Sequence, residues 1–340
     1  MNRALLVALV ALSVVACGRD ETMAERGGQP LVVYASHNAT ETAAVLESYR
    51  SRTGQRFRLL TDDMAETDVR LGNSAMMPEA DLFLAASLAE IWAAAEADAL
   101  RPVFSADVDS AVAAWLRDPE ARWIALSRRA RVVVRNTASV GSTDLASLQD
   151  YAGLQGERWK GRLCVSSSSV PGNRALVAHL IRRHGVREAE LIVRGWRANL
   201  AMTVFTNDGT LLNAIADGRC GIGIVDSSVL AAFLTSVPDA PVLAHWFADA
   251  ANVLVDISAA AVTRHAGQPE QAQALLEWLA SPEPNGLYAD LRFEFPVNAA
   301  APVNAIGVSW TGGLPPDAPL PELGFLLEEA DLLIERARYP

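Results

Sequence analysis

Short apolar runs alternate with longer amphipathic segments along the chain from residue 31 onward. Runs of four or five apolar residues are typical of buried strands, whereas apolar residues three or four positions apart are typical of one helix face. The alternation of the two patterns predicts an α/β fold. The expected strands are residues 31–35, 56–60, 81–85, 131–135, 163–165, 222–225 and 251–262.

The strand at residues 131–135 directly follows the stretch 123–130, which contains no glycine or proline. This continuity predicts one long extended segment that crosses the molecule. Helices are expected between the strands. Asn38, with Glu41 three residues later, forms a capping-box pattern at the start of the first helix.

The first 16 residues are expected to form a secretory signal peptide. Residues 4–16 are an apolar run of 13 behind one basic residue, Arg3. A helix needs about 20 such residues to span a bilayer, so this run is too short for a membrane span. Cys17 follows directly, which resembles the lipobox of bacterial lipoproteins; the alternative is a plain signal peptide with an incidental cysteine. Residues 17–30 are polar and would form a lipid-anchored tether, so we expect a membrane-anchored lipoprotein of the periplasm.

Two further cysteines, Cys164 and Cys220, both lie in short strand-like runs. In an oxidising compartment, an even pair of cysteines is typical of a disulfide. A bridge that closes a loop of about 57 residues would stabilise the fold by roughly 4 kcal/mol. The alternative is a pair of buried free thiols.

Length, charge and motifs narrow the function classes. A chain of 340 residues is long enough for about two domains. Acidic residues outnumber basic ones by 40 to 29, and the formal charge of −11 argues against a nucleic-acid partner. The sequence has no GxSxG elbow, no P-loop, no GxGxxG fingerprint and no cysteine-pair metal motif. We therefore expect a binding protein rather than an enzyme, and no resident cofactor.

Four strand–loop–helix corners carry small polar residues, at 36–40, 166–169, 206–210 and 226–228. In open α/β sheets, ligands bind beyond the carboxyl ends of the strands, where helix N-termini present free N–H groups. Each corner taken singly is also an ordinary helix cap, but the set predicts a polar cleft. The expected ligand-binding residues are His37, Asn38, Ser166, Ser167, Ser168, Ser169, Asn207, Asp208, Thr210, Asp226, Ser227 and Ser228. Arg128 or Arg129, near the crossing segment, is expected to pair with an anion.

Several stretches, in their order and spacing, resemble the periplasmic ferric-iron-binding proteins that serve ABC importers. They include residues 31–34 (LVVY), 123–136 (WIALSRRARVVVRN), 159–165 (WKGRLCV), 216–225 (ADGRCGIGIV), 277–282 (EWLASP) and 295–297 (FPV). The resemblance covers residues 31–300, and its specificity lies in the ordered set rather than in any single motif. A subgroup of that family also has the cysteine pair and the serine-rich loop.

The resemblance implies two α/β lobes of the type II periplasmic-binding-protein fold, joined by two crossing strands with the ligand between them. Residues 31–130 with about 242–310 would form the first lobe, and residues 131–241 with about 311–340 the second. The resemblance also implies an ABC permease and its ATPase as partners.

The subgroup holds Fe(III) largely with tyrosine phenolates, and this chain departs from that pattern. The positions expected to hold tyrosine carry Asn38, Gly172, Ser228 and Val229. We therefore expect a small polar or anionic solute. One alternative is Fe(III) held by His37, Asp208 and Asp226, although the sequence favours the interpretation of His37 as a solvated loop residue. Another is a tethered sensor or accessory protein that keeps the fold.

Overall fold

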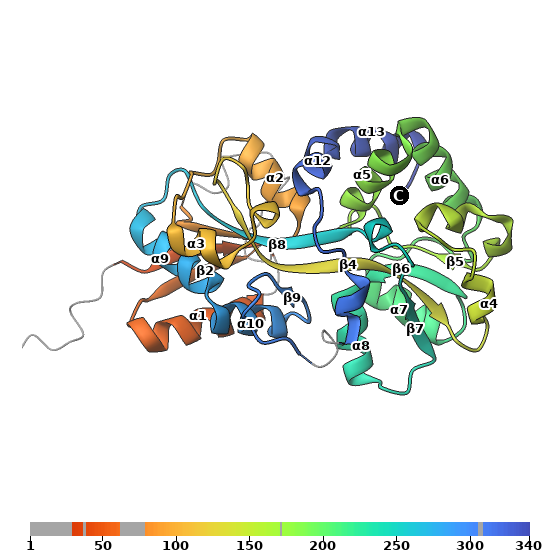
Figure 1. Ribbon diagram of the computed structural model, residues 1–340, viewed down its shortest axis with the longest axis horizontal. Helices are drawn as coiled ribbons and strands as arrows, with labels where there is room; N and C mark the ends of the chain where they lie inside the picture. The colour runs from red at the N-terminus through yellow and green to blue at the C-terminus, as the bar shows by residue number, and fades with distance from the viewer. Residues whose placement is uncertain (1–28, 37–38, 62–78, 171, 305–308) are drawn as a thin grey trace, which may run out of the picture.

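The computed structural model describes residues 29–36, 39–61, 79–170, 172–304 and 309–340. Two α/β lobes, on the left and right of Figure 1, are joined by the long strands β4 (Ile124–Asn136) and β8 (Val255–Val262). These two strands are antiparallel neighbours. The predicted two-lobed α/β fold with two crossing strands is confirmed. The expected signal peptide, Cys17, His37 and Asn38 lie outside the described residues.

The strands form one continuous sheet in the order β2-β1-β3-β8-β4-β6-β5, with β7 and β9 also paired to β4. Each lobe contains parallel pairs of strands. In the first lobe β1 is parallel to both β2 and β3, and in the second lobe β5 is parallel to β6. The pairs that involve β4 and β8 are antiparallel. The crossing strands therefore carry the sheet from one lobe into the other.

The first lobe packs helices around the strands of its half of the sheet. Helix α2 begins after Ser87, whose side chain accepts a hydrogen bond from the backbone N–H of Glu90, and α9 begins with Pro269. The elements of this lobe are β1 (Leu31–Ala35), α1 (Ala39–Thr53), β2 (Phe57–Thr61), β3 (Leu82–Ala85), α2 (Leu88–Glu96), α3 (Ala106–Ala111), η4 (Ala114–Leu116), α9 (Pro269–Ala280), α10 (Pro282–Leu291) and β9 (Phe295–Pro296).

The second lobe has shorter strands and more helices. Gly185 ends α5 in a conformation with φ of 80°, which a residue without a Cβ adopts readily. The elements are α4 (Ser142–Leu145), η5 (Tyr151–Gln155), η6 (Glu157–Trp159), β5 (Leu163–Cys164), α5 (Asn173–His184), α6 (Val186–Ala198), α7 (Asp208–Ala216), β6 (Ile222–Asp226), α8 (Ser227–Ser236), β7 (Val242–His245), η7 (Ala250–Asn252), η8 (Thr311–Gly313), α12 (Leu320–Phe325) and α13 (Leu327–Ala337).

Strand β7 corrects the expected division of the chain. The resemblance predicts that residues from about 242 onward belong to the first lobe, but β7 pairs with Val133–Asn136, the second-lobe half of β4. Figure 1 accordingly places β7 in the second lobe, where β7 and β6 pair with opposite edges of β4. The chain therefore re-enters the first lobe through β8, about 13 residues later than predicted from the resemblance. The loop between β7 and β8, residues 246–254 (WFADAANVL), is mostly apolar and gives no sequence signal that separates the lobes.

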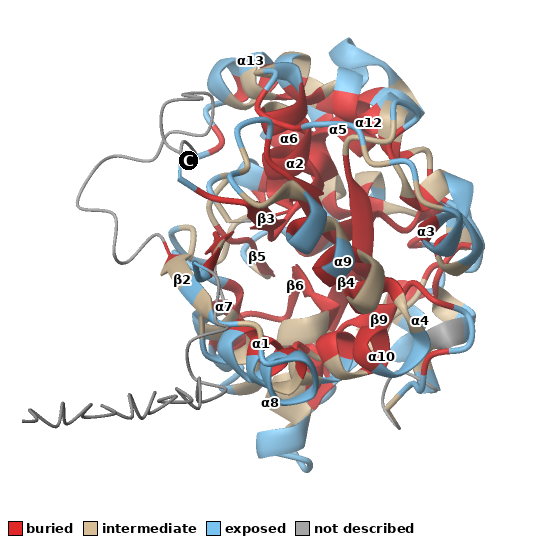
Figure 2. Ribbon diagram, turned by 90° about the vertical axis from the view of Figure 1, so that its left-hand side faces the viewer, coloured by how far each residue is buried: buried red, intermediate tan, exposed pale blue. Residues whose placement is uncertain are grey.

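Buried residues, red in Figure 2, run through the sheet and the inner faces of the helices. The largest fully buried side chains include one tryptophan in the first lobe, Trp123, and two in the second, Trp159 and Trp196. A second contact between the lobes lies outside the crossing strands. Trp92 of α2 packs edge-on against Phe325 of α12, with ring centroids 4.9 Å apart. The C-terminal helices thus touch both lobes.

Cys164 and Cys220 form a disulfide, as expected, with Cα atoms 5.9 Å apart. Cys164 ends β5, and Cys220 lies two residues before β6, its parallel neighbour. The bridge therefore fixes the two strands that lead into the serine-rich loop and into Asp226. Among the residues that the structure describes, no helix is long and apolar enough to cross a membrane.

Candidate ligand-binding cleft

A cavity of about 420 Å³ lies between the lobes, against the crossing strand β4. Its wall combines residues after β3, on β4, at the starts of α7 and α8, and around the turn from α10 to β9. The lining residues are Ala86, Arg129, Val170, Asn207, Asp208, Gly209, Asp226, Ser228, Val229, Arg292 and Glu294. This volume suits a small solute.

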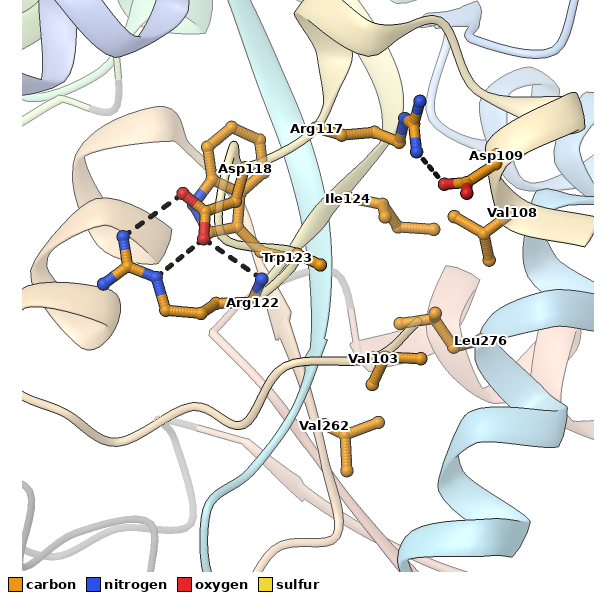
Figure 3. Close-up of a pocket in the computed structure, with 11 residues that line it drawn as sticks. Val103, Val108, Asp109, Arg117, Asp118, Arg122, Trp123, Ile124, Val262 and Leu276 are labelled. Atoms are coloured by element: carbon orange, nitrogen blue, oxygen red, sulfur yellow. Dashed lines mark hydrogen bonds and ion pairs between the residues drawn. The ribbon is translucent and has the colours of Figure 1, made fainter. Parts of the chain in front are cut away.

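A second, enclosed cavity in the first lobe is shown in Figure 3. Its volume is about 30 Å³, which is room for about one water molecule. Asp118 and Arg122 form an ion pair on one side of it, at 2.6 Å, and Val103, Val262 and Leu276 lie on the other. This cavity is a packing feature rather than a solute site, because it is too small for a solute.

Arg129 lies on the floor of the interlobe cavity and joins several acidic groups. Its Nε donates to Oδ2 of Asp226 at 2.8 Å, and its Nη2 donates to Oδ2 of Asp256 at 2.8 Å. Nη2 also donates to the backbone carbonyl of Ala86, and Nη1 lies 3.5 Å from Oε1 of Glu294. Burial alone would lower the pKa of Arg129, but the surrounding carboxylates raise it above its usual value. One guanidinium therefore links both lobes and the crossing strands.

A second buried ion pair joins Arg131 to Asp208. Nη1 of Arg131 donates to Oδ2 of Asp208 at 2.5 Å, and the two side chains are 1% and 3% exposed. Asp208 also accepts hydrogen bonds from the Ser166 hydroxyl at 2.6 Å and from the backbone N–H of Asp226 at 2.8 Å. Both carboxylate oxygens of Asp208 thus have donors within the protein.

Asp226 caps helix α8 and faces the same cavity. Its Oδ1 accepts hydrogen bonds from the backbone N–H and the hydroxyl of Ser228, at 2.9 and 2.7 Å. Burial raises the pKa of Asp226, although Arg129 and Arg131 act in the opposite direction. Asp226 therefore serves two internal partners, a guanidinium and a helix terminus.

Glu294 is a buried carboxylate that lines the cavity on the first-lobe side. It accepts hydrogen bonds from the hydroxyls of Ser127 and Ser258 and lies 3.5 Å from Nε of Arg292. Burial alone would raise the pKa of Glu294, but Arg292, Arg129 and the two hydroxyls hold it below its usual range. This carboxylate is therefore ionised and balanced by its neighbours.

Two helix N-termini meet at the cavity. The first residues of α7 and of α8 line it, and their caps, Asn207 and Asp226, hold the first turns in place. Helix N-termini carry partial positive charge and free N–H groups, which favour oxyanions and carbonyl oxygens. Asn207 and Asp226 each accept one N–H group of these first turns, and the partial positive charge of the two helix N-termini adds to that of Arg129 at the cavity.

The structure brings only some of the predicted ligand-binding residues to the cavity wall. Asn207, Asp208, Asp226 and Ser228 line it. Ser166 and Ser227 are buried and bind inside the protein: the hydroxyl of Ser166 donates to Asp208, and that of Ser227 accepts from the backbone N–H of Ala130. These two serines therefore stabilise the elements that form the cleft, rather than contacting a solute.

The rest of the predicted set lies beside the cavity rather than on its wall. Ser167 and Ser169 bond to each other, and the backbone N–H of Ser168 donates to the carbonyl of Pro340, so the serine-rich loop packs against the C-terminal residues. Thr210 is exposed and bonds to Asn207. Of the two arginines proposed for an anion, Arg129 lines the cleft. Arg128 points to the other face of the strand, with its guanidinium 5.9 Å from the Trp115 ring.

Sequence reasoning missed two charged residues that line the cavity, Arg292 and Glu294, and two that pair with lining residues, Arg131 and Asp256. One signal was present. Ser127, Arg129 and Arg131 are two positions apart on an apolar strand, so they share one face. A polar face on a strand that is otherwise buried marks a site or an ion-pair network.

All five tyrosines of the chain fall within the described residues, and all are buried. Their exposed fractions are 7% for Tyr34, 8% for Tyr49, 0% for Tyr151, 2% for Tyr288 and 4% for Tyr339. None lines the interlobe cavity. Burial raises the pKa of Tyr49, Tyr151, Tyr288 and Tyr339. Tyr34 stacks on Phe83 in the first-lobe core. The cleft therefore offers no phenolate.

Histidine, cysteine, aspartate and glutamate side chains do not gather into a group of three or more suited to a metal ion anywhere in the described part of the chain. His179, buried in α5, has its pKa lowered to about 4 by burial and by Arg183 and Arg182. His184 lies 3.2 Å from Asp150. Neither histidine faces the interlobe cavity.

Two α/β lobes on a pair of crossing strands, with a polar cavity between them, define a two-lobed binding protein that holds a small solute. Residues 31–289 match the family of bacterial extracellular solute-binding proteins, and the chain belongs to this family.

The chain is similar to iron uptake protein A1 of Synechocystis, with 26% identity over 332 residues that cover 94% of this chain and 91% of the relative. A Trichodesmium IdiA/FutA structure, in complex with iron and citrate, has 28% identity and a TM-score of 0.78, covering 92% of this chain and 100% of that one. The apo ferric ion-binding protein A of Pasteurella haemolytica has a TM-score of 0.83 at 24% identity, covering 92% and 98%. This last likeness concerns the fold alone.

Proposed function

We propose that the protein captures a small polar or anionic solute outside the cytoplasm and delivers it to an ABC permease and its ATPase. The observation that supports this most is the pairing of Asp208 with Arg131 and of Asp226 with Arg129. Those carboxylates have partners inside the protein, while the starts of α7 and α8 line the cavity and carry the partial positive charge of helix N-termini. An oxygen-rich solute fits the hydrogen-bond donors of such a surface.

Closure of the lobes over the solute would be a hinge movement about β4 and β8. Arg129 bonds to groups of both lobes, so it would stay near the axis of such a movement. Ser228 and Asn207, on the second-lobe side, would supply hydrogen bonds.

Ferric iron is the second candidate, favoured by the names of the relatives, which are iron uptake and ferric-binding proteins. In this chain it would need an anion such as citrate to supply ligand oxygens, because no phenolate lines the cavity. His37 lies outside the described residues. Both candidates therefore place an oxygen-rich anion in the cavity, either as the solute itself or as a ligand of iron. The geometry supports a bare ferric ion less well.

The solute is identified by mass spectrometry of small molecules and metals that co-purify with the native protein. Binding is then measured by calorimetry with the wild type, with Ser228→Phe and with Ser236→Phe. Ser228 lines the cavity, whereas Ser236 is exposed at the far end of the same helix. We expect the first substitution to abolish binding and the second to leave it unchanged; equal affinity of both variants would contradict the site.

We also propose that Cys17 carries a lipid that tethers the protein to the membrane. The apolar run that ends at residue 16 and the polar linker that follows support this. Cys17→Ser should release the protein into the soluble periplasmic fraction. A wild-type protein that is already wholly soluble after cell lysis would contradict the anchor.

A further inference from the structure

We propose that Arg129 and Arg131 act as resident cations of the cleft, balancing Asp208 and Asp226 so that the cavity rejects metal cations and admits anions. They are specificity-determining residues that act through the two carboxylates. The inference deepens the proposed function and rests on it, because it explains how a cleft with acidic walls would select a polar or anionic solute.

The two carboxylates are immediate neighbours. The backbone N–H of Asp226 donates to Oδ2 of Asp208 at 2.8 Å, and both residues line the cavity together with Asn207 and Ser228. Two carboxylates, an amide oxygen and a hydroxyl are the ligand types that hard cations such as Ca²⁺ bind. Without the arginines, this corner would therefore have the donor set of an oxygen-ligated cation site.

The arginines are fixed in place. Arg129 is held by Asp256 and by the carbonyl of Ala86 in addition to Asp226. Arg131 also donates to the carbonyl of Ile224, and a Cβ on Gly172 would lie 3.3 Å from its Cδ, so the loop before α5 packs directly on its side chain. An incoming cation would have to separate a buried guanidinium from its carboxylate partner, which is strongly unfavourable.

The charge of each guanidinium, rather than its shape, carries the selectivity in this account. Arginine stays protonated at any ordinary pH and has no acceptor atoms for a metal ion. Glutamine at position 131 would still donate a hydrogen bond to Asp208 but would not balance its charge. The resulting uncompensated carboxylate would then attract a cation from solution.

The test compares the melting temperatures of the wild type, Arg131→Gln, Arg131→Lys and the double variant Arg131→Gln/Asp208→Asn, with and without terbium chloride or calcium chloride. We expect the cation to raise the melting temperature of Arg131→Gln by at least about 3 °C. The wild type, the lysine variant and the double variant should shift by less than about 1 °C. Terbium luminescence reports the same binding directly.

A wild type that responds as strongly as Arg131→Gln, or an Arg131→Gln variant that does not respond, would overturn the inference. Arg129→Gln, which leaves Asp226 unbalanced, must show the same cation response; should Arg131→Gln not fold, this variant decides. Anion binding by the wild type is measured separately. If the wild type binds no anion while the glutamine variants bind a cation, the proposed function is wrong, but the role proposed for the arginines stands.

Discussion

Oδ2 of Asp226, the residue that caps helix α8 in the second lobe, lies 2.8 Å from Nε of Arg129 on the strand that joins the lobes. The side chains are 8% and 5% exposed, so the pair is shielded from water. The position of α8 at the cleft is thereby coupled to the hinge. A buried pair of this kind is costly to break from one side, because the remaining charge has lost its partner.

Asp226→Ala should therefore lower the free energy of unfolding by about 3 kcal/mol, through the lost ion pair and the lost helix cap. Chemical denaturation measures this. Asp239→Ala, at an exposed position, is the control and should change stability by less than about 0.5 kcal/mol. Equal effects of the two substitutions would show that the pair does not stabilise the cleft.

His179 should make stability depend on pH. Its pKa in the folded protein is lowered to about 4, below the value of about 6.5 in an unfolded chain. The unfolded state therefore binds the proton more readily, so the stabilisation is full above about pH 6.5 and is lost as the pH falls toward 4, by about 3 kcal/mol.

The measurement compares how stability changes between pH 7 and pH 4.5 in three proteins. His179→Gln should lose less stability over this range than the wild type. His265→Gln, which replaces an exposed histidine, should behave as the wild type does. If all three proteins lose the same amount, His179 is not the group responsible.

The disulfide between Cys164 and Cys220 should contribute about 4 kcal/mol by restricting the unfolded chain. A reductant should lower the melting temperature of the wild type by several degrees once the buried bond is reduced. The double variant Cys164→Ala/Cys220→Ala should melt at the lower temperature with or without reductant. A double variant as stable as the oxidised wild type would rule out this contribution.

At Gly324, α12 lies close against α2 of the first lobe. A Cβ at this position would lie 2.3 Å from ring atoms of Trp92. Gly324→Ala should therefore lower stability by about 1–3 kcal/mol through overpacking. Gly312→Ala is the matched control, because a Cβ there meets no atom within 4 Å. Thermal denaturation separates the two, and similar melting temperatures would contradict the contact.

The alternation of apolar runs predicted the crossing segment and the buried strands, because buried strands are read directly from sequence, but it did not predict the short strands β7 and β9. It also placed Asp208 and Asp226 at corners that the fold brings together. The hydrophobic pattern could not show which side chains are already bonded inside the protein, because those bonds join residues that are distant in the sequence. Ser166 was expected to bind solute, but Asp208, 42 residues away, already accepts its hydrogen bond.

The role of the arginines could not be predicted from local pattern for the same reason. The partners of Arg129 are Asp226 and Asp256, which are 97 and 127 residues away. Spacing along β4 shows that Arg129 and Arg131 share a face, but only the folded chain shows which carboxylates they neutralise. The serine-rich loop also has a partner that is distant in the sequence: the hydroxyl of Tyr339, near the C-terminus, donates to the carbonyl of Ser166 at 2.7 Å.

The most direct test of the central claim is a titration of the purified protein with ferric citrate, followed by visible absorption and calorimetry. Every tyrosine is at most 8% exposed and none lines the cavity, so no phenolate reaches the solute. We predict no phenolate-to-iron absorption band and, at best, weak binding of iron itself. A strong visible band together with nanomolar affinity for iron would contradict the account and identify the cleft as a phenolate-based ferric site.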